Sequence, residues 1–335
     1  MANNVNHNNT PAQHPFQNEG PSRYRRIRKM IFLSVLAMFI AILAVFIPDA
    51  WDYRSRLKLF SELQPVQLKN CEMKRYGLGR DEGYLLCDNL LEDIRAVYSY
   101  GIDGRDGLGC EISTKLKVPV RQYDCFNLER PVCPLGNTLF HEECVGGVTE
   151  RDEAGRLFDT VENQIIKNND AGKTLLLKMD IEGAEWESLA ATSDEALQNV
   201  DQIAIEFHKN PDKLEYVDLI KKLKKTFYIA HIHFNNSKYA CTKGLDRPFP
   251  SWAFQVLMVN KKVGILDDGR KPVLPNPLDE KDNPNLPDCQ NLDQENVYET
   301  GRLFLHNKIN NIKLSVRRIL PTRQTLSKLY QQSQN

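Results

Sequence analysis

The longest hydrophobic stretch of this chain lies near its beginning, from Met30 to Ile47. Ser34 is the only polar residue among these eighteen positions, and Pro48-Asp49 follows directly. A helix rises about 1.5 Å per residue, so this stretch nearly crosses the hydrocarbon core of a bilayer. A helix buried in a protein core rarely lacks a polar face. The pattern therefore predicts one transmembrane helix.

The flanking residues predict the orientation of this helix. Five basic residues precede it, and positively charged flanks stay in the cytoplasm. We expect residues 1–29 to be a disordered cytoplasmic tail, 30–47 a type II signal anchor, and 48–70 a stem before a lumenal domain. A cleaved signal peptide is the alternative; the long polar leader and the lack of a small-x-small site after Ile47 disfavour it. The basic residues are Arg23, Arg25, Arg26, Arg28 and Lys29.

Beyond residue 70, short apolar runs alternate with helical patterns. Leu157, Val161 and Ile165 recur at i, i+4 and i+8, and a spacing of three predicts another helix from Leu214 to Leu223. Strands that alternate with helices predict an α/β fold with a mostly parallel sheet covered on both faces. The last two strands lack a helix between them and are expected to form an antiparallel edge. The predicted strands are 96–100, 118–123, 174–179, 202–207, 227–234 and 253–260.

The charge and the cysteine content limit which partners and which cellular compartment the sequence favours. The chain has 335 residues, and Lys+Arg and Asp+Glu both total 44, so no overall field favours nucleic acid. All eight cysteines follow the predicted anchor, which suits an oxidising compartment; free buried cysteines are the alternative. Eight cysteines allow about 105 full pairings. No CxxC pair occurs, and we assign no metal ligand. Asn235-Asn236-Ser237 is a short, weakly specific glycosylation motif.

Three stretches stand where parallel strands end, which is where α/β folds bind ligands. The first is a glycine-rich turn at 99–107, with a GxxGxxG spacing that an ordinary loop could also show. The second is Asp124, where an acid can accept hydrogen bonds from a ribose; a solvated loop acid is the alternative. The third, 175–185, runs from a buried strand into Asp180, Glu182 and Glu185. Desolvated like charges favour a ligand or a cation there, and helix capping is the alternative for the two glutamates.

Lys178-Met179-Asp180-Ile181-Glu182-Gly183-Ala184-Glu185 resembles the LK-x-D-x-EGAE signature of FkbM-type methyltransferases. Cys71 through Arg75-Tyr76-Gly77 to Asp81-Glu82-Gly83-Tyr84 and Cys87, together with 97–101, resembles the membrane-anchored methyltransferase-like proteins of animals. The resemblance covers about 71–260. It implies a Rossmann-like, seven-stranded sheet with an antiparallel last strand, S-adenosylmethionine as methyl donor, and a Cys71–Cys87 disulfide. Residues 71–262 would then be the catalytic domain, followed at 263–335 by a proline-rich arm and C-terminal tail.

The resemblance also assigns residues to the donor. Gly101 and Asp103 would lie at its methionine end, in the loop that contains Gly104. Asp124 would hold the ribose, and Asp180 would lie beside the sulfonium and the acceptor. Asp103 stands where the family often has a second glycine, which leaves the donor contacts of this loop open.

Polar side chains at the ends of the later strands are the candidates for acid–base chemistry. Glu206 and His208 share one face of a strand, and His231 and His233 share one face of the next. We expect His208 or His233 to be the general base, with Glu206 orienting it; a structural role for each histidine is the alternative.

The function expected from these patterns is S-adenosylmethionine-dependent methylation, on oxygen, of a lumenal or secreted glycan, peptide or small metabolite. The expected setting is the Golgi or endoplasmic reticulum, with the bilayer as a partner through residues 30–47. There are two alternatives: a lumenal glycosyltransferase and a catalytically inactive binding domain. Activity that depends on a metal ion would favour the glycosyltransferase.

Overall fold

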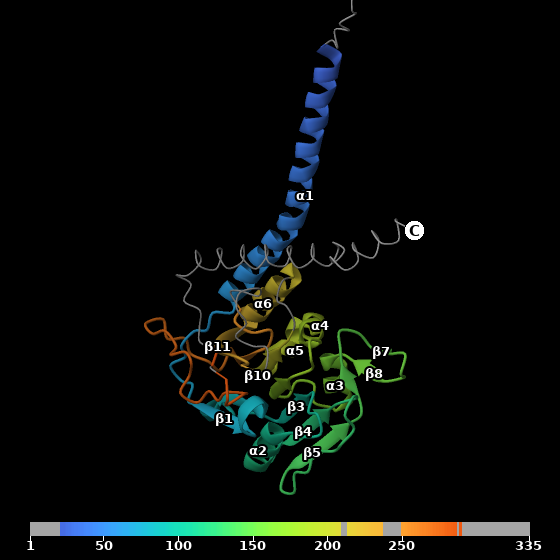
Figure 1. Cartoon of the computed structure of the whole chain (residues 1–335). Coiled ribbons are helices and arrows are strands. Elements are labelled where there is room, and N and C mark those ends of the chain that lie inside the picture. Colours follow the sequence, from blue (N-terminus) through green and yellow to red (C-terminus); the bar gives the residue numbers. More distant parts are fainter. Residues whose placement is uncertain (1–20, 209–212, 237–248, 287, 290–335) are drawn as a thin grey trace, which may run out of the picture. The chain divides into compact units, whose positions relative to one another are not determined.

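The computed structural model describes residues 21–208, 213–236, 249–286 and 288–289, without the side chains of 21–24, 41–52 and 81. The chain divides into two compact units, one up to Trp51 and one from Asp52 onwards. The second unit contains a seven-stranded sheet and a strand–helix alternation (Figure 1). The predicted α/β class is therefore confirmed.

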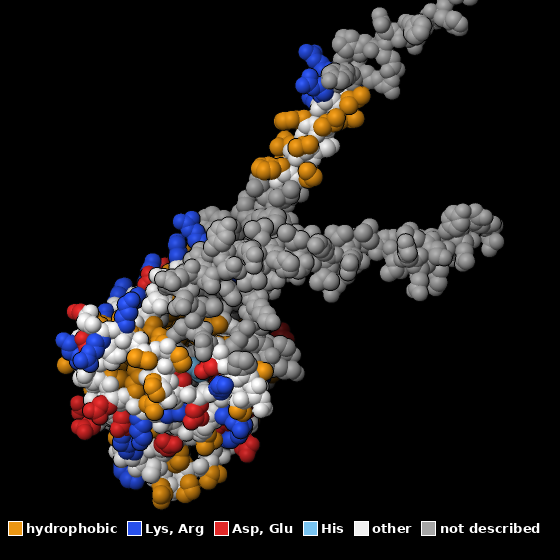
Figure 2. All heavy atoms as spheres, turned by 60° about the vertical axis from the view of Figure 1, so that its left-hand side comes forward, with side chains coloured by type: hydrophobic (Ala, Val, Ile, Leu, Met, Phe, Trp, Pro, Cys, Tyr) orange, Lys and Arg blue, Asp and Glu red, His pale blue; other side chains and the backbone are white. Residues whose placement is uncertain are grey.

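One helix, α1 (Pro21–Glu62), contains the predicted anchor, so residues 21–29 are helical rather than part of a disordered tail. The described side chains at 30–40 are exposed and mostly apolar, and basic side chains precede them (Figure 2). Within the described part of the chain, no helix is both long enough and apolar enough to cross a membrane. The predicted anchor continues into 41–47, whose side chains lie outside that part, and it stays a prediction.

The large sheet has the order β11-β12-β10-β9-β3-β4-β5, and all strands are parallel except β12. The last two strands, β11 and β12, pair antiparallel at one edge of the sheet as predicted, and β12 lies between β10 and β11. The strands are β3 (Ala96–Tyr100), β4 (Pro119–Tyr123), β5 (Asn137–His141), β9 (Leu175–Met179), β10 (Val200–Phe207), β11 (Phe227–Phe234) and β12 (Phe254–Asn260).

Apolar side chains on the two faces of this sheet form two cores. One core packs against helices α3 to α6, and the other packs against α2 and the hairpin β1–β2. Leu176 and Leu177 lie in different cores because successive strand residues point to opposite faces. The covering elements are α2 (Gly107–Leu116), α3 (Val161–Lys167), α4 (Glu185–Ala191), α5 (Asp194–Gln198), α6 (Leu214–Thr226), β1 (Met73–Gly77) and β2 (Gly83–Cys87).

Two predicted boundaries differ from the structure. The predicted stem is partly core: Leu59 and Leu63 are fully buried, and the amide of Val66 donates to the carbonyl of Ile229. Leu157, predicted at the start of a helix, lies instead in β8 (Leu157–Asp159), and α3 begins at Val161. β8 pairs with β6 (Cys144–Val145) and β7 (Glu150–Arg151) in a small sheet.

Three disulfides join six cysteines of the described part of the chain. Cys71–Cys87, implied by the family resemblance, is confirmed, and Cys110–Cys133 and Cys125–Cys144 add two more bridges. The described residues include no free cysteine. The second and third bridges hold the segment between β4 and β6, so they restrain the loop that carries Asp124.

A buried carboxylate, Asp159, gives the fold a dependence on acid. Burial favours its neutral form, but Lys167, Thr149 and Asn163 hydrogen-bond to the ionised carboxylate and lower its pKa to about 2. The folded pKa lies below the unfolded value, so this stabilisation is present above about pH 4 and is lost as the pH falls towards 2.

We expect Asp159→Asn to lower the free energy of unfolding at pH 7 by about 2 kcal/mol, because it removes the charge that the folded state stabilises. Denaturant unfolding at a series of pH values measures this. The difference between the parent and the variant should shrink between pH 4 and pH 2, and Asp268→Asn on the exposed surface should show no difference. A gap that is independent of pH would contradict the assignment.

Candidate functional site

A cleft of about 940 Å³ opens at the carboxyl ends of β3, β4, β9 and β10. The strand order reverses at β3, since β4 lies on one side of it and β9 on the other, and such a switch point leaves a crevice for ligands. We call this cavity the acidic cleft because eight carboxylates line it, against one arginine, one lysine and His208. They are Glu82, Asp103, Asp106, Asp124, Asp180, Glu182, Glu187 and Glu206, with Arg105 and Lys178.

The glycine-rich loop after β3 forms the floor of the cleft. Gly101 has φ +69°, and a Cβ there would lie 1.7 Å from the carbonyl oxygen of Asp180. Only glycine lets the two strand ends approach this closely. Gly101 and Asp103 line the cleft as predicted, whereas Gly104 forms the turn beside Asn127 and is not among the lining residues that the structure describes.

Asp124 connects this loop to the next one. Its Oδ2 accepts from the amide of Asp103 at 2.9 Å, and its Oδ1 accepts from the amides of Phe126 and Asn127 at 2.8 and 3.0 Å. A carboxylate offers about four acceptor positions. Asp124 can therefore hold both loops and still accept one hydrogen bond from a ligand in the cleft.

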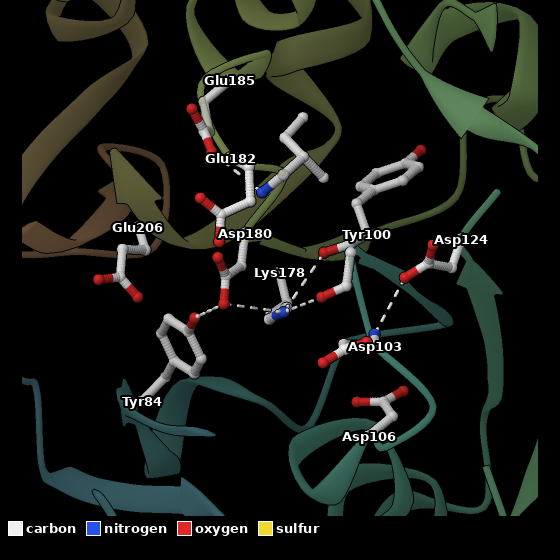
Figure 3. A network of polar contacts seen from close by, with 12 residues as sticks. Tyr84, Tyr100, Asp103, Asp106, Asp124, Lys178, Asp180, Glu182, Glu185 and Glu206 are labelled. Carbon is white, nitrogen blue, oxygen red and sulfur yellow. Dashed lines mark hydrogen bonds and ion pairs between the residues drawn. The ribbon is translucent and has the colours of Figure 1, made fainter. Parts of the chain in front are cut away.

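Asp180 directly follows β9 and lines the cleft, and its two oxygens have different neighbours (Figure 3). Tyr84 donates to Oδ2 at 2.8 Å, and the Lys178 ammonium lies 3.5 Å from the same oxygen. Lys178 also donates to the carbonyl of Gly101 at 2.8 Å. Oδ1 instead faces His208, whose Nε2 lies 3.7 Å away.

The turn after Asp180 is organised by Glu185, which is fully buried at the start of α4. Its Oε1 accepts from the amides of Ile181 at 2.9 Å and Gly183 at 3.1 Å, and it lies 2.9 Å from Nδ1 of His208. Glu182, between those amides, has φ +54° and presents an exposed carboxylate to the cleft. The EGAE segment is thus a turn held from inside by its last glutamate.

His208 follows β10 and is enclosed by acids. Burial lowers its pKa, but the hydrogen bond to Glu185 and the charges of Glu185, Glu206 and Asp180 outweigh this and raise the pKa to about 9. Trp186 donates its indole N–H to the carbonyl of His208 at 2.9 Å and thereby fixes the backbone. The imidazole is held in one orientation, with Nδ1 towards Glu185 and Nε2 towards the cleft.

Glu206 also lines the cleft, but it does not orient His208 as the sequence analysis expects; Glu185 does. Asn235 donates its amide to Oε1 of Glu206 at 2.9 Å, and both side chains are buried. Asn235 is also the acceptor of the glycosylation motif, whose Ser237 lies outside the described residues. A glycan on Asn235 would break this contact, so the folded domain disfavours it.

The two histidines of β11 lie away from the cleft. His231 Nε2 is 2.8 Å from Asp279, and His233 Nε2 is 3.4 Å from Asp288. Neither imidazole is among the described lining residues. β10 and β11 follow one another along the chain, but β12 lies between them in the sheet. His233 on β11 is therefore not placed next to Glu206 on β10.

Two groups at the site were not assigned from the sequence. Tyr84 comes from β2, and only its short spacing to Cys87 within the family-like segment could have indicated it. Lys178 lies inside the buried strand, where a lysine is unusual and therefore informative.

Asp180, Glu182 and His208 each offer a ligand atom within 4.8 Å of the others, a set that could hold a metal ion.

No protein-family model matches this chain, and no curated protein is significantly similar to it.

We expect Glu185→Ala to destabilise the domain by about 3 kcal/mol, because it leaves two amides and the Nδ1 of a buried histidine without their acceptor. Thermal unfolding of the full-length chain measures the loss. Glu187→Ala is the matched control, since it removes an exposed glutamate from the same helix. Equal melting temperatures for the two variants would refute the role of Glu185.

Proposed function

We propose that the chain is an S-adenosylmethionine-dependent methyltransferase, whose donor occupies the acidic cleft. The observation that carries this proposal is Asp124: an acid at the end of β4 is joined to the amide of Asp103 at the switch point of a mostly parallel sheet. The sheet with its one antiparallel strand, the Cys71–Cys87 bridge and the EGAE turn agree with the FkbM-type resemblance.

The residues of the cleft fit such a donor. Asp124 keeps one acceptor position for a ribose hydroxyl. Phe126, whose ring the Arg156 guanidinium covers on one side, and Phe158 line the cleft and can contact a purine. The excess of carboxylates suits a ligand that carries a sulfonium and an ammonium charge. Asp180 lies close to Gly101, so the donor and an acceptor could meet between β3 and β9.

When bound, the donor would supply a methyl group: the acceptor oxygen would bond to the methyl carbon while the bond from that carbon to the sulfonium sulfur breaks, and a thioether would be left. The protein mainly has to align the acceptor and exclude water. Tyr84 and Lys178 hold one oxygen of Asp180, which leaves the other directed into the cleft. Both ring nitrogens of His208 face carboxylates, so Glu206 is the better placed group to accept the proton that the acceptor hydroxyl loses.

We further propose that this domain works in an oxidising compartment of the secretory pathway, on a type II anchor formed by residues 30–47. The three disulfides support the compartment. The basic residues before the apolar stretch support the orientation.

Calorimetric titration of the full-length chain in detergent with S-adenosylmethionine tests the donor assignment. We expect micromolar binding, weakened at least about tenfold in Asp124→Asn. The neutral asparagine side chain accepts a hydrogen bond from a ribose hydroxyl more weakly than the charged carboxylate of Asp124 does. Asp268→Asn, an exposed aspartate outside the cleft, should bind like the parent. Absence of binding by a chain that unfolds cooperatively would refute the proposal, and binding of a nucleotide-sugar instead would favour a glycosyltransferase.

A further inference from the structure

Asp180, Glu182 and His208 lie at the ends of neighbouring parallel strands, with one ligand atom of each within 4.8 Å of the others. His208 Nε2 is 3.7 Å from Oδ1 of Asp180 and 3.9 Å from Oε2 of Glu182. Bonds of about 2.1 Å place two ligands of a tetrahedral ion about 3.4 Å apart. The three atoms thus need only small side-chain rotations to surround one ion.

The buried imidazole of His208 supports a ligand at this point independently of the nearby carboxylates. Its side chain is 5% exposed, and its Nε2 points into the cluster at distances too long for a hydrogen bond to any described residue. The other nitrogen is bound to the buried Glu185 at 2.9 Å. Metal-binding histidines commonly donate their second ring nitrogen to a carboxylate in this way, which leaves the first one as the ligand.

The surrounding charges favour a cation at this point. Glu185 and Glu206 are almost completely removed from solvent, and Asp180 and Glu182 stand beside them (Figure 3). Apart from His208 itself, the basic group at this cluster is Lys178. It contacts Oδ2 of Asp180 and two backbone carbonyls, so it neutralises the side of Asp180 that faces away from His208. The two buried carboxylates, Glu185 and Glu206, are costly unless a positive charge lies beside them, and a protonated His208 or a bound cation supplies that charge.

We propose that Asp180, Glu182 and His208 bind one divalent transition-metal ion at the wall of the acidic cleft. An imidazole with two carboxylates suits ions such as Zn²⁺ and Mn²⁺, whereas Ca²⁺ requires six to eight oxygens. Three protein ligands leave a coordination position open towards the cleft for water or a substrate oxygen. Glu185 is the positioning residue that fixes the orientation of the imidazole.

This site does not rest on the proposed methyl transfer, since it follows from the three side chains alone. It replaces the sequence-based expectation of no metal ligand, because His208 comes from a different strand and only the fold brings it to the EGAE turn. With such a site, metal-dependent activity would no longer favour a glycosyltransferase over a methyltransferase. An ion held by this turn is compatible with either donor, so the donor, not the metal, distinguishes a methyltransferase from a glycosyltransferase.

The test uses the full-length, metal-stripped chain in detergent, titrated with Zn²⁺ and Mn²⁺ at pH 7.5. We expect one ion per chain, with Zn²⁺ bound more tightly than Mn²⁺. Glu182→Gln should weaken binding at least about tenfold; the Glu182 side chain is 80% exposed, so the fold should tolerate the change. Glu187→Gln is the matched control, because it removes the same charge from another exposed lining residue.

Pulsed electron paramagnetic resonance of bound Mn²⁺ tests the nitrogen ligand. We expect a coupling to an imidazole nitrogen in the parent and in Glu187→Gln, and its loss in His208→Asn. No saturable binding by the folded parent would overturn the proposal. So would equal weakening by Glu182→Gln and Glu187→Gln, which would show attraction by the whole cleft, or bound Mn²⁺ without nitrogen coupling.

Discussion

The arrangement of the site depends on one buried carboxylate, Glu185. It is fully removed from solvent, which is costly for an ionised group unless donors surround it. Two amides of the preceding turn and the imidazole of His208 supply donors to its Oε1. One side chain therefore sets the path of the chain after β9, the start of α4 and the orientation of a residue beyond β10. The exposed Glu182 is carried by a turn that Glu185 holds.

The second constraint is the close approach of β3 and β9. Gly101 lies against the carbonyl of Asp180, and no larger residue would fit. Lys178 then binds the carbonyls of Tyr100 and Gly101 and contacts Asp180. A lysine inside a buried strand is tolerated because its ammonium donates to two backbone carbonyls and lies beside the carboxylate of Asp180. The same contact brings the loop after β3 and the carboxylate after β9 into one cleft.

Regular, buried elements could be predicted from the sequence, and exposed or long-range ones could not. Six of the seven sheet strands have apolar runs that mark them, but β5 lies at the sheet edge with Leu139 exposed. The acids at strand ends were predicted because parallel strands place their ends together. The contact of Tyr84 with Asp180 was not, because it joins a hairpin to a strand far along the chain. His208 was predicted as reactive, but its partner is Glu185 rather than Glu206, since periodicity cannot say which of several acids an imidazole faces.

The acidic cleft has two halves, and Lys178 connects them. Asp103 and Asp124 form one half, and Asp180 and Glu182 belong to the other (Figure 3). His208, which follows β10, completes the second half. An ion bound at the second half, as proposed, would draw charge from Asp180 and weaken its hold on Lys178, which would then interact more strongly with the carbonyl of Gly101. The loop that would carry the donor would therefore respond to the occupancy of the proposed metal site, because Asp180 and Lys178 lie between the two halves.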